Sequence, residues 1–246
     1  MVADALSDAM VPVPDHGRLF RSTDRVRLGD VSPHGRLRLD ALVRLLQDVS
    51  DDDVRDAAFE GNWVVRRLAI QVDRFPEYGE DLELTTFCSG LGSHWAERRV
   101  EVHGDRGGTA SASTIWVLVD PTTAAPARLG EEFLVIYGPS AGDRRVRARL
   151  HHDGPPTDGE RGAWRFRFVD YDVLRHVNNA AYWVVVEEHL ARRRDLRAPM
   201  RAEIEFRAAV ERDDDTEIVV LDEDRALKVW IVSGRGVHAS LTVSSP

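Results

Sequence analysis

Residues 165–190 read RFRFVDYDVLRHVNNAAYWVVVEEHL. Arginine alternates with aromatic residues at the start, which is typical of a strand. The polar loop DVLRHVNN (172–179) follows, and then an apolar run with helical spacing. Residues 25–49, RVRLGDVSPHGRLRLDALVRLLQDV, repeat this order of alternating strand, Asp-Val-x-x-His and helix. The two segments predict two copies of one unit.

A second match supports the duplication. Asp30 falls on Asp172 and His34 on His176 at an offset of 142 residues. Further on, LAIQVDRFPEYGEDLELTTF (68–87) matches AEIEFRAAVERDDDTEIVVL (202–221) at an offset of 134, which gives the first copy eight extra residues between helix and strand. Two matches in the same order indicate a duplicated fold.

Each copy is predicted to contain one helix followed by several strands. The helices are marked by apolar residues three or four apart, at Leu39, Leu42, Val43, Leu46 and Val49, and at Tyr182, Val185, Val186 and His189. The β-branched segments 112–120 and 227–234 favour strands, and GDRGG (104–108) and SGRG (233–236) are typical of hairpin turns. This order predicts an α+β fold in which an antiparallel sheet wraps around a central helix, twice in tandem.

Composition sets the predicted domain limits. Residues 1–18 are expected to form an N-terminal arm and residues 19–145 a first domain. HHDGPPTDGERG (151–162) is polar and rich in Pro and Gly, so residues 146–162 are predicted to be a linker. Residues 163–246 then form the second domain.

Bulk composition excludes several classes of protein. The 246 residues are 43% hydrophobic and 30% charged, as in an ordinary globular chain. A net charge of −9 disfavours nucleic-acid binding, and a single cysteine, Cys88, excludes an intrachain disulfide. No apolar run is long enough to span a membrane, and the N-terminus lacks a signal-peptide pattern, so a cytoplasmic location is expected.

Common enzyme motifs are absent from the sequence. There is no Gly-x-Ser-x-Gly elbow, and GLG (90–92) is too short for a phosphate-binding loop. His151 and His152 have no neighbouring partners in a zinc-ligand pattern. Cys88 is expected to be a small buried residue.

The 172–179 loop is open to two interpretations. Asn178 or Asn179 would cap a helix that begins near Ala180, and Asp172 would end the strand in a turn. Alternatively, the N–H groups of that helix start would polarise an acyl carbonyl. In that case Asp172 would activate water or attack the acyl carbon, and His176 with an Asn side chain would position the water or assist proton transfer.

The loop and the apolar helix after it resemble the second half of acyl-acyl carrier protein (ACP) thioesterases, which are two hot-dog domains fused in one chain. The segments 35–48, 63–102 and 112–129 are similar to the first half, so the resemblance covers residues 19–246. It implies hydrolysis of a fatty acyl thioester to the free acid in fatty acid biosynthesis, without metal or organic cofactor. It also implies an acyl-phosphopantetheine carrier protein as partner, with an acyl-CoA as the alternative substrate.

The resemblance also assigns site residues. Asp172 matches the family's catalytic aspartate and His176 its histidine, but Leu174 stands where the family usually has Asn. Asn178 is then expected to take that role, or the carboxylate acts alone. On the following strand Ala209-Val210 stands where plant members have Glu-Cys, which leaves Glu211 as a candidate for water activation. Asn179 and Tyr182 are expected to bind substrate.

Other features receive structural interpretations. The first-copy loop, with Asp30 and His34, is expected to be structural or to line an acyl tunnel, and Trp63, Trp95 and Trp116 to form core or tunnel wall. RRVRAR (144–149) and ARRRDLR (191–197) are candidate carrier-binding clusters, or solvated surface. A non-catalytic acyl-binding protein and a hot-dog dehydratase remain alternatives, and either a monomer or a homodimer is compatible with a fused pair.

Overall fold

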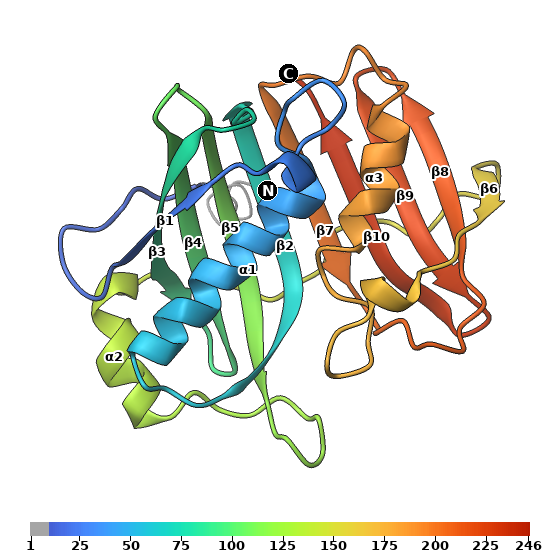
Figure 1. Ribbon diagram of the computed structural model, residues 1–246. Helices are drawn as coiled ribbons and strands as arrows, with labels where there is room; N and C mark the ends of the chain where they lie inside the picture. The colour runs from blue at the N-terminus through green and yellow to red at the C-terminus, as the bar shows by residue number, and fades with distance from the viewer. Residues whose placement is uncertain (1–9) are drawn as a thin grey trace.

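A computed structural model describes residues 10–246, and within them the chain forms one 10-stranded sheet (Figure 1). The strand order is β1-β3-β4-β5-β2-β7-β10-β9-β8-β6, and every neighbouring pair is antiparallel. The first half contains β1 (Phe20–Arg25), β2 (Asn62–Arg74), β3 (Asp81–Leu91), β4 (Trp95–Gly104) and β5 (Thr109–Val119). The second contains β6 (Glu160–Ala163), β7 (Met200–Phe206), β8 (Glu217–Glu223), β9 (Ala226–Ser233) and β10 (Gly236–Ser244).

The two halves meet where β2 pairs with β7. Leu68 lies opposite Ile204 and Ala69 opposite Glu203 in this register. The strand order is the same read outward from the junction in either direction, so the halves are related by an approximate two-fold axis. The predicted arrangement of two sheet-and-helix units in tandem is confirmed, and the two sheets are joined edge to edge.

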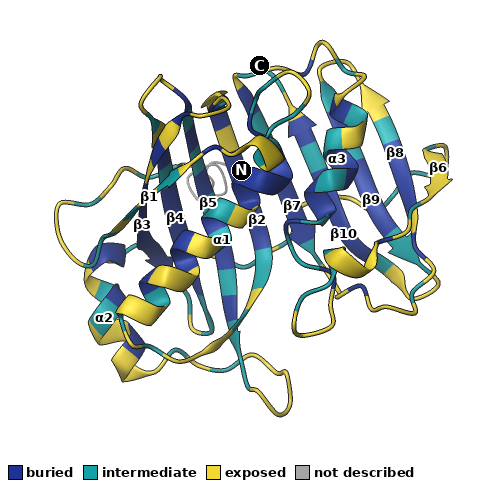
Figure 2. Ribbon diagram, viewed as in Figure 1, coloured by how far each residue is buried: buried dark blue, intermediate teal, exposed yellow. Residues whose placement is uncertain are grey.

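A helix from each half covers the same face of the sheet (Figure 1): α1 (Leu39–Asp56) and α3 (Tyr182–Leu190). On α1 the predicted apolar positions are buried, whereas its outer side is exposed (Figure 2). Burial of one leucine of this set stabilises the fold by about 1.5–3 kcal/mol. One apolar core runs beneath both helices and across the junction. None of the helices in residues 10–246 combines the length and apolar composition needed to cross a bilayer.

The register predicted for the two loops is wrong by two residues. Arg38 N–H donates to the Asp30 carbonyl at 2.9 Å, and the equivalent bond runs from Asn178 N–H to the Asp170 carbonyl at 2.8 Å. Gly35 and Arg175 both have positive φ, 83° and 65°. The loops therefore superpose at an offset of 140, at which Asp170, and not Asp172, matches Asp30.

This register changes two further expectations. His34 falls on Leu174, whereas His176 takes the place of Arg36. The second offset of 134 is confirmed, because Leu37 N–H donates to the Pro76 carbonyl as Val177 N–H does to that of Val210. The first copy thus has six extra residues between helix and strand, and the eight predicted were too many.

Local structure also differs from prediction before each loop. The alternating segments were expected to be strands, but β1 ends at Arg25 and β6 at Ala163, and each loop is preceded by a single 3-10 turn, Leu28–Asp30 or Phe168–Asp170. Both predicted hairpins are confirmed. α2 (Glu131–Ala141), which packs on β3, was not predicted. Residues 1–9 of the expected arm lie outside the described residues.

Candidate active site

The loop before α3 is held closed by one carboxylate. Asp172 Oδ1 accepts the backbone N–H of Leu174 at 2.9 Å and that of His176 at 3.3 Å. A backbone bond from Asp172 N–H to the His176 carbonyl, 2.9 Å, closes the same turn. The capping interpretation is therefore correct for Oδ1. Oδ2 of Asp172 makes no hydrogen bond to the part of the chain that the structure describes.

His176 and Glu211 are neighbours through their backbones. The two residues form an isolated antiparallel bridge, and both are exposed. The Glu211 carboxylate forms an ion pair with Arg235 at 3.1 Å, and Arg235 also pairs with Asp214. The pair with Arg235 holds the Glu211 carboxylate at the surface, so the structure gives Glu211 a role in the turn after β7.

Asn178 and Tyr182 have structural contacts. Asn178 Oδ1 accepts the N–H of Ala180 at 2.9 Å, which caps the turn that leads into α3. Tyr182 is 1% exposed, and its ring packs against Phe166 and Phe206. Its hydroxyl accepts the Val210 N–H at 3.4 Å, and burial raises the pKa of this hydroxyl. Tyr182 thus ties α3 to the end of β7.

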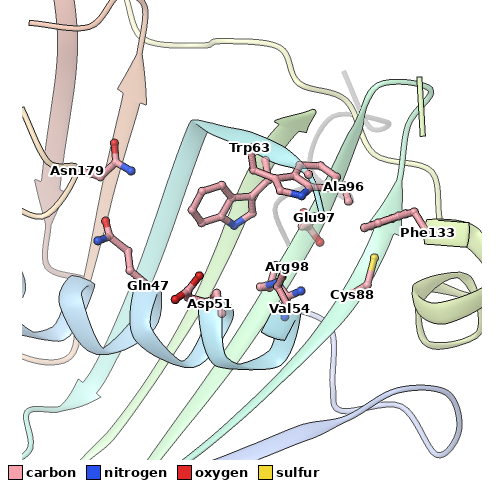
Figure 3. Close-up of a pocket in the computed structure, with 13 residues that line it drawn as sticks. Gln47, Asp51, Val54, Trp63, Cys88, Ala96, Glu97, Arg98, Phe133 and Asn179 are labelled. Carbon is pink, nitrogen blue, oxygen red and sulfur yellow. The ribbon is translucent and has the colours of Figure 1, made fainter. Parts of the chain in front are cut away.

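A cavity of about 310 Å³ lies in the first half, between α1 and the sheet (Figure 3). Its size is at the lower end of the range for small-molecule sites. α1 contributes Gln47, Ser50, Asp51 and Val54 to the wall, and of the six predicted site residues Asn179 alone reaches it. Asn179 comes from the second half, so the cavity meets the start of α3.

The cavity wall is aromatic and polar. Trp63, Trp116 and Phe133 supply aromatic surface, so the two tryptophans line this cavity. Trp95 lies nearby with its indole N–H bonded to the Val146 carbonyl at 2.9 Å. These rings form the apolar part of the wall, and flat aromatic surfaces pack well against apolar groups.

Charged groups line part of the same cavity. Arg98 Nη1 forms an ion pair with the buried Asp53 at 2.5 Å, and Glu97 pairs with Arg144. Asp51 also lines the cavity, and its carboxylate is 58% exposed and pairs with Arg55 at 2.7 Å. Cys88 is buried here, and burial raises the pKa of its thiol to about 11. The thiol stays protonated at neutral pH, which makes it a poor nucleophile.

The polar residues of α1 were missed by sequence reasoning. Gln47 lies three residues before Ser50 and four before Asp51, so the three polar side chains lie on one side of the helix. From sequence alone, polar positions of this kind indicate a solvent-exposed side of a helix. Their position next to the apolar stripe of the same helix is the one feature of the sequence that would have indicated a cavity-lining role.

Other predicted features have ordinary partners. Asp30 pairs with Arg44 at 2.8 Å and His34 is exposed, so the first loop has a structural role. In the two arginine clusters, Arg144 pairs with Glu97, and Arg193 pairs with Asp195 and Asp222. Leu174 is 66% exposed at the loop tip and does not line the cavity.

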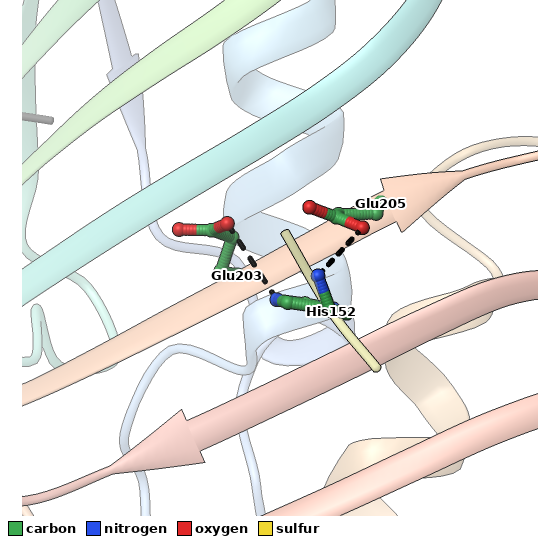
Figure 4. A group of neighbouring side chains, drawn as sticks. All are labelled: His152, Glu203 and Glu205. Atoms are coloured by element: carbon green, nitrogen blue, oxygen red, sulfur yellow. Dashed lines mark hydrogen bonds and ion pairs between the residues drawn. The ribbon is translucent and has the colours of Figure 1, made fainter. Parts of the chain in front are cut away.

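One cluster has metal-ligating side chains. Single ligand atoms of His152, Glu203 and Glu205 lie within 4.8 Å of one another (Figure 4). His152 Nε2 lies 3.5 Å from Glu203, and Glu205 accepts the backbone N–H groups of His151 and His152. Arg67 faces Glu205 across the β2–β7 pairing. The carboxylates of Glu203 and Glu205 on β7 thus contact His151 and His152 of the linker, so the cluster anchors the linker to β7.

Comparisons with known proteins agree with this architecture. The chain matches the acyl-ACP thioesterase N-terminal domain over residues 17–137 and the C-terminal domain over residues 155–236. An uncharacterized Mycobacterium tuberculosis protein is 29% identical over 235 residues, 94% of each chain. The palmitoyl-acyl carrier protein thioesterase of Arabidopsis thaliana is 25% identical over 195 residues, which span 69% of this chain and 47% of the plant protein.

Solved structures share the fold. The 12:0-ACP thioesterase of Umbellularia californica superposes with a TM-score of 0.78 at 19% identity, over 93% of this chain and 97% of that one. An oleoyl thioesterase (putative) from Lactobacillus plantarum gives a TM-score of 0.75. These likenesses confirm the double hot-dog fold. With both of its halves matched by the corresponding domain models, the chain belongs to the acyl-ACP thioesterase family.

Proposed function

We propose that this protein hydrolyses the thioester of an acyl group carried on ACP, and releases the free acid and the carrier thiol. The observation that carries the proposal is the cavity between α1 and the sheet, because it meets the start of α3 at Asn179. An acyl chain in the cavity would have its thioester carbonyl at that helix start. The backbone N–H of Asn179 and the helix dipole would then stabilise the developing oxyanion.

The loop supplies the carboxylate in this proposal. Asp172 Oδ2 takes a proton from water, and the water oxygen bonds to the acyl carbon. The tetrahedral intermediate then expels the sulfur, and the proton returns from Asp172 to the thiolate. His176 positions the water from the exposed side of the loop. Asn178 holds the turn at the start of α3, and Glu211 supports the loop through its bridge to His176.

Leu174 stands where the family usually has Asn, and Ala209-Val210 stands where plant members have Glu-Cys. In this proposal the mechanism therefore depends mainly on Asp172. This difference supports a second function, acyl binding without turnover. The two functions differ in one observable, which is whether the thiol is released from an acyl carrier.

The carrier is proposed to be an acidic protein and not free CoA. Arg175 is exposed at the tip of the same loop, and no ion pair to it is found in residues 10–246. A free positive charge beside the site would attract an acidic carrier protein. CoA is also anionic, so the preference for ACP is supported by the match of both halves to acyl-ACP thioesterase domains.

The test is thiol release from acyl-ACP and acyl-CoA substrates that carry the same series of acyl chain lengths. We expect turnover on acyl-ACP with a kcat/KM above that for the CoA ester of the same chain. Binding of acyl-ACP without thiol release would show that the protein is a carrier-binding module and not a hydrolase.

A further inference from the structure

The approximate two-fold axis creates two equivalent junctions between a loop and the opposite half's helix. At the offset of 140, Arg36 corresponds to His176, Leu39 to Asn179 and Gln47 to Glu187. In the first junction the start of α1 faces Glu187 of α3. In the second the start of α3 faces Gln47 of α1. The two junctions can therefore be compared residue by residue within one chain.

A carboxylate occupies the first junction. Glu187 Oε1 accepts the backbone N–H of Leu39, the first residue of α1, at 2.6 Å. Arg36 donates to both oxygens of Glu187, at 2.9 and 2.7 Å. The Glu187 side chain is 9% exposed. This junction thus binds a carboxylate at a helix start with a cation beside it, which is how an anion is held at such a site.

The second junction has the same geometry without that occupant. Gln47 faces the start of α3, and Figure 3 shows its side chain directed toward Asn179. Gln47 Nε2 donates to Asn178 Oδ1 at 3.4 Å, a long bond, and it has a second hydrogen to donate. Gln47 Oε1 is buried with no hydrogen-bond partner among residues 10–246. This junction opens to the cavity, which Gln47 and Asn179 both line.

We infer that Gln47 is a substrate-binding residue that donates a side-chain N–H to the thioester carbonyl beside the backbone N–H of Asn179. The Glu187 carboxylate at the first junction then corresponds to the carboxylate of the product at the second junction. His176 of the second junction corresponds to Arg36 of the first. This inference rests on the proposed function. It means that the protein has one reactive junction, because the other is permanently filled by its own side chain.

The sharpest test replaces Gln47 and Glu187 in separate variants, each by the residue type found at the other junction. Gln47→Glu has nearly the shape of Gln47 but places a carboxylate before Asn179, as Glu187 does before Leu39. We expect kcat/KM on acyl-ACP to fall about 100-fold or more, because the carboxylate removes the oxyanion donor and also repels the developing anion. Gln47→Ala removes the donor without filling the site, so its loss should be smaller, about tenfold.

Glu187→Gln is the matched control. It makes the same chemical exchange at the first junction, in the opposite direction, and we expect kcat/KM to stay within about twofold of wild type because no substrate binds there. Circular dichroism and thermal melting show whether each variant folds. If Gln47→Glu does not fold, Gln47→Met replaces it, since it removes both polar atoms at similar volume and should match Gln47→Ala.

A binding measurement separates this inference from the proposed function. Quenching of tryptophan fluorescence by dodecanoate reports occupancy, since Trp63 and Trp116 line the cavity. Wild type should bind the fatty acid anion and Gln47→Glu should bind it about 100-fold more weakly, even if no substrate is hydrolysed. Wild-type activity or binding in Gln47→Glu, or an equal loss in Glu187→Gln, would overturn the inference.

Discussion

Arg98 and Asp53 form a buried ion pair of 2.5 Å between the cavity wall and α1. The Asp53 side chain is 1% exposed, and its other oxygen accepts Arg18 Nε at 2.6 Å. One carboxylate thus holds two arginines, one from the sheet and one from the segment before β1. The pair fixes the helix that carries Gln47 and Asp51 against the sheet.

Removal of this carboxylate should destabilise the fold. Asp53→Ala leaves Arg98 buried without its partner, which typically costs about 3–5 kcal/mol. Urea unfolding followed by circular dichroism measures the change. Glu217→Ala is the control, because its pair with Arg161 is exposed and should contribute less than about 1 kcal/mol. Equal losses in the two variants would contradict the role given to Asp53.

Cys88 should be unreactive in the folded protein. The pKa of its thiol is raised by burial to about 11, so at pH 8 the group remains in the unreactive thiol form. A disulfide exchange reagent at pH 8 should modify it only in denaturant. Cys88→Ser should keep thioesterase activity, because the proposed mechanism uses no thiol. Rapid modification of the native protein, or an inactive but folded Cys88→Ser, would disagree with this expectation.

The cavity should set the preferred acyl chain length. Ala96 is 6% exposed and lines the cavity, so Ala96→Phe places a ring in the space that the acyl chain would occupy. We expect the ratio of kcat/KM for short over long acyl-ACPs to rise about tenfold or more, because added volume excludes the longer chains. An unchanged chain-length profile in a folded Ala96→Phe would show that acyl chains bind elsewhere.

Arg175 should contribute to recognition of the carrier protein. Arg175→Asn removes the charge and keeps a residue that tolerates the positive φ of 65°. Its KM for acyl-ACP should rise by about 3–10-fold, with a weaker dependence on salt. Arg225→Asn is matched to it, since Arg225 is also exposed with a positive φ of 56° but lies on the β8–β9 turn. An equal rise in KM for acyl-ACP in both variants would show that Arg175 has no specific role in carrier binding.

The duplicated fold could be predicted from sequence because each copy has the same order of periodic segments. The loop register could not, because Asp30 and Asp172 were matched by residue identity. The backbone hydrogen bonds to the Asp30 and Asp170 carbonyls determine how the two loops superpose, and these bonds cannot be inferred from side-chain identity. α2 was missed because it contains Gly138 and Pro139, which usually mark turns.

The site was only partly predictable for a related reason. Asn179 was named from the loop, and it does line the cavity. Gln47 and Asp51 come from the other half of the chain. Their position opposite Asn179 results from the β2–β7 pairing, which no local sequence pattern indicates. Tyr182 was expected to bind substrate from its place at the helix start, but its ring faces the core between Phe166 and Phe206.

The most direct test compares wild type with two aspartate variants in a single-turnover assay of free acid released from dodecanoyl-ACP. Asp172→Ala removes the proposed base, and Asp51→Ala removes the exposed carboxylate of the cavity wall. Wild type should release the acid, Asp172→Ala should be slower by about 100-fold or more, and Asp51→Ala should stay within about tenfold. No release by wild type, or full activity in a folded Asp172→Ala, would contradict the proposal that this loop performs thioester hydrolysis.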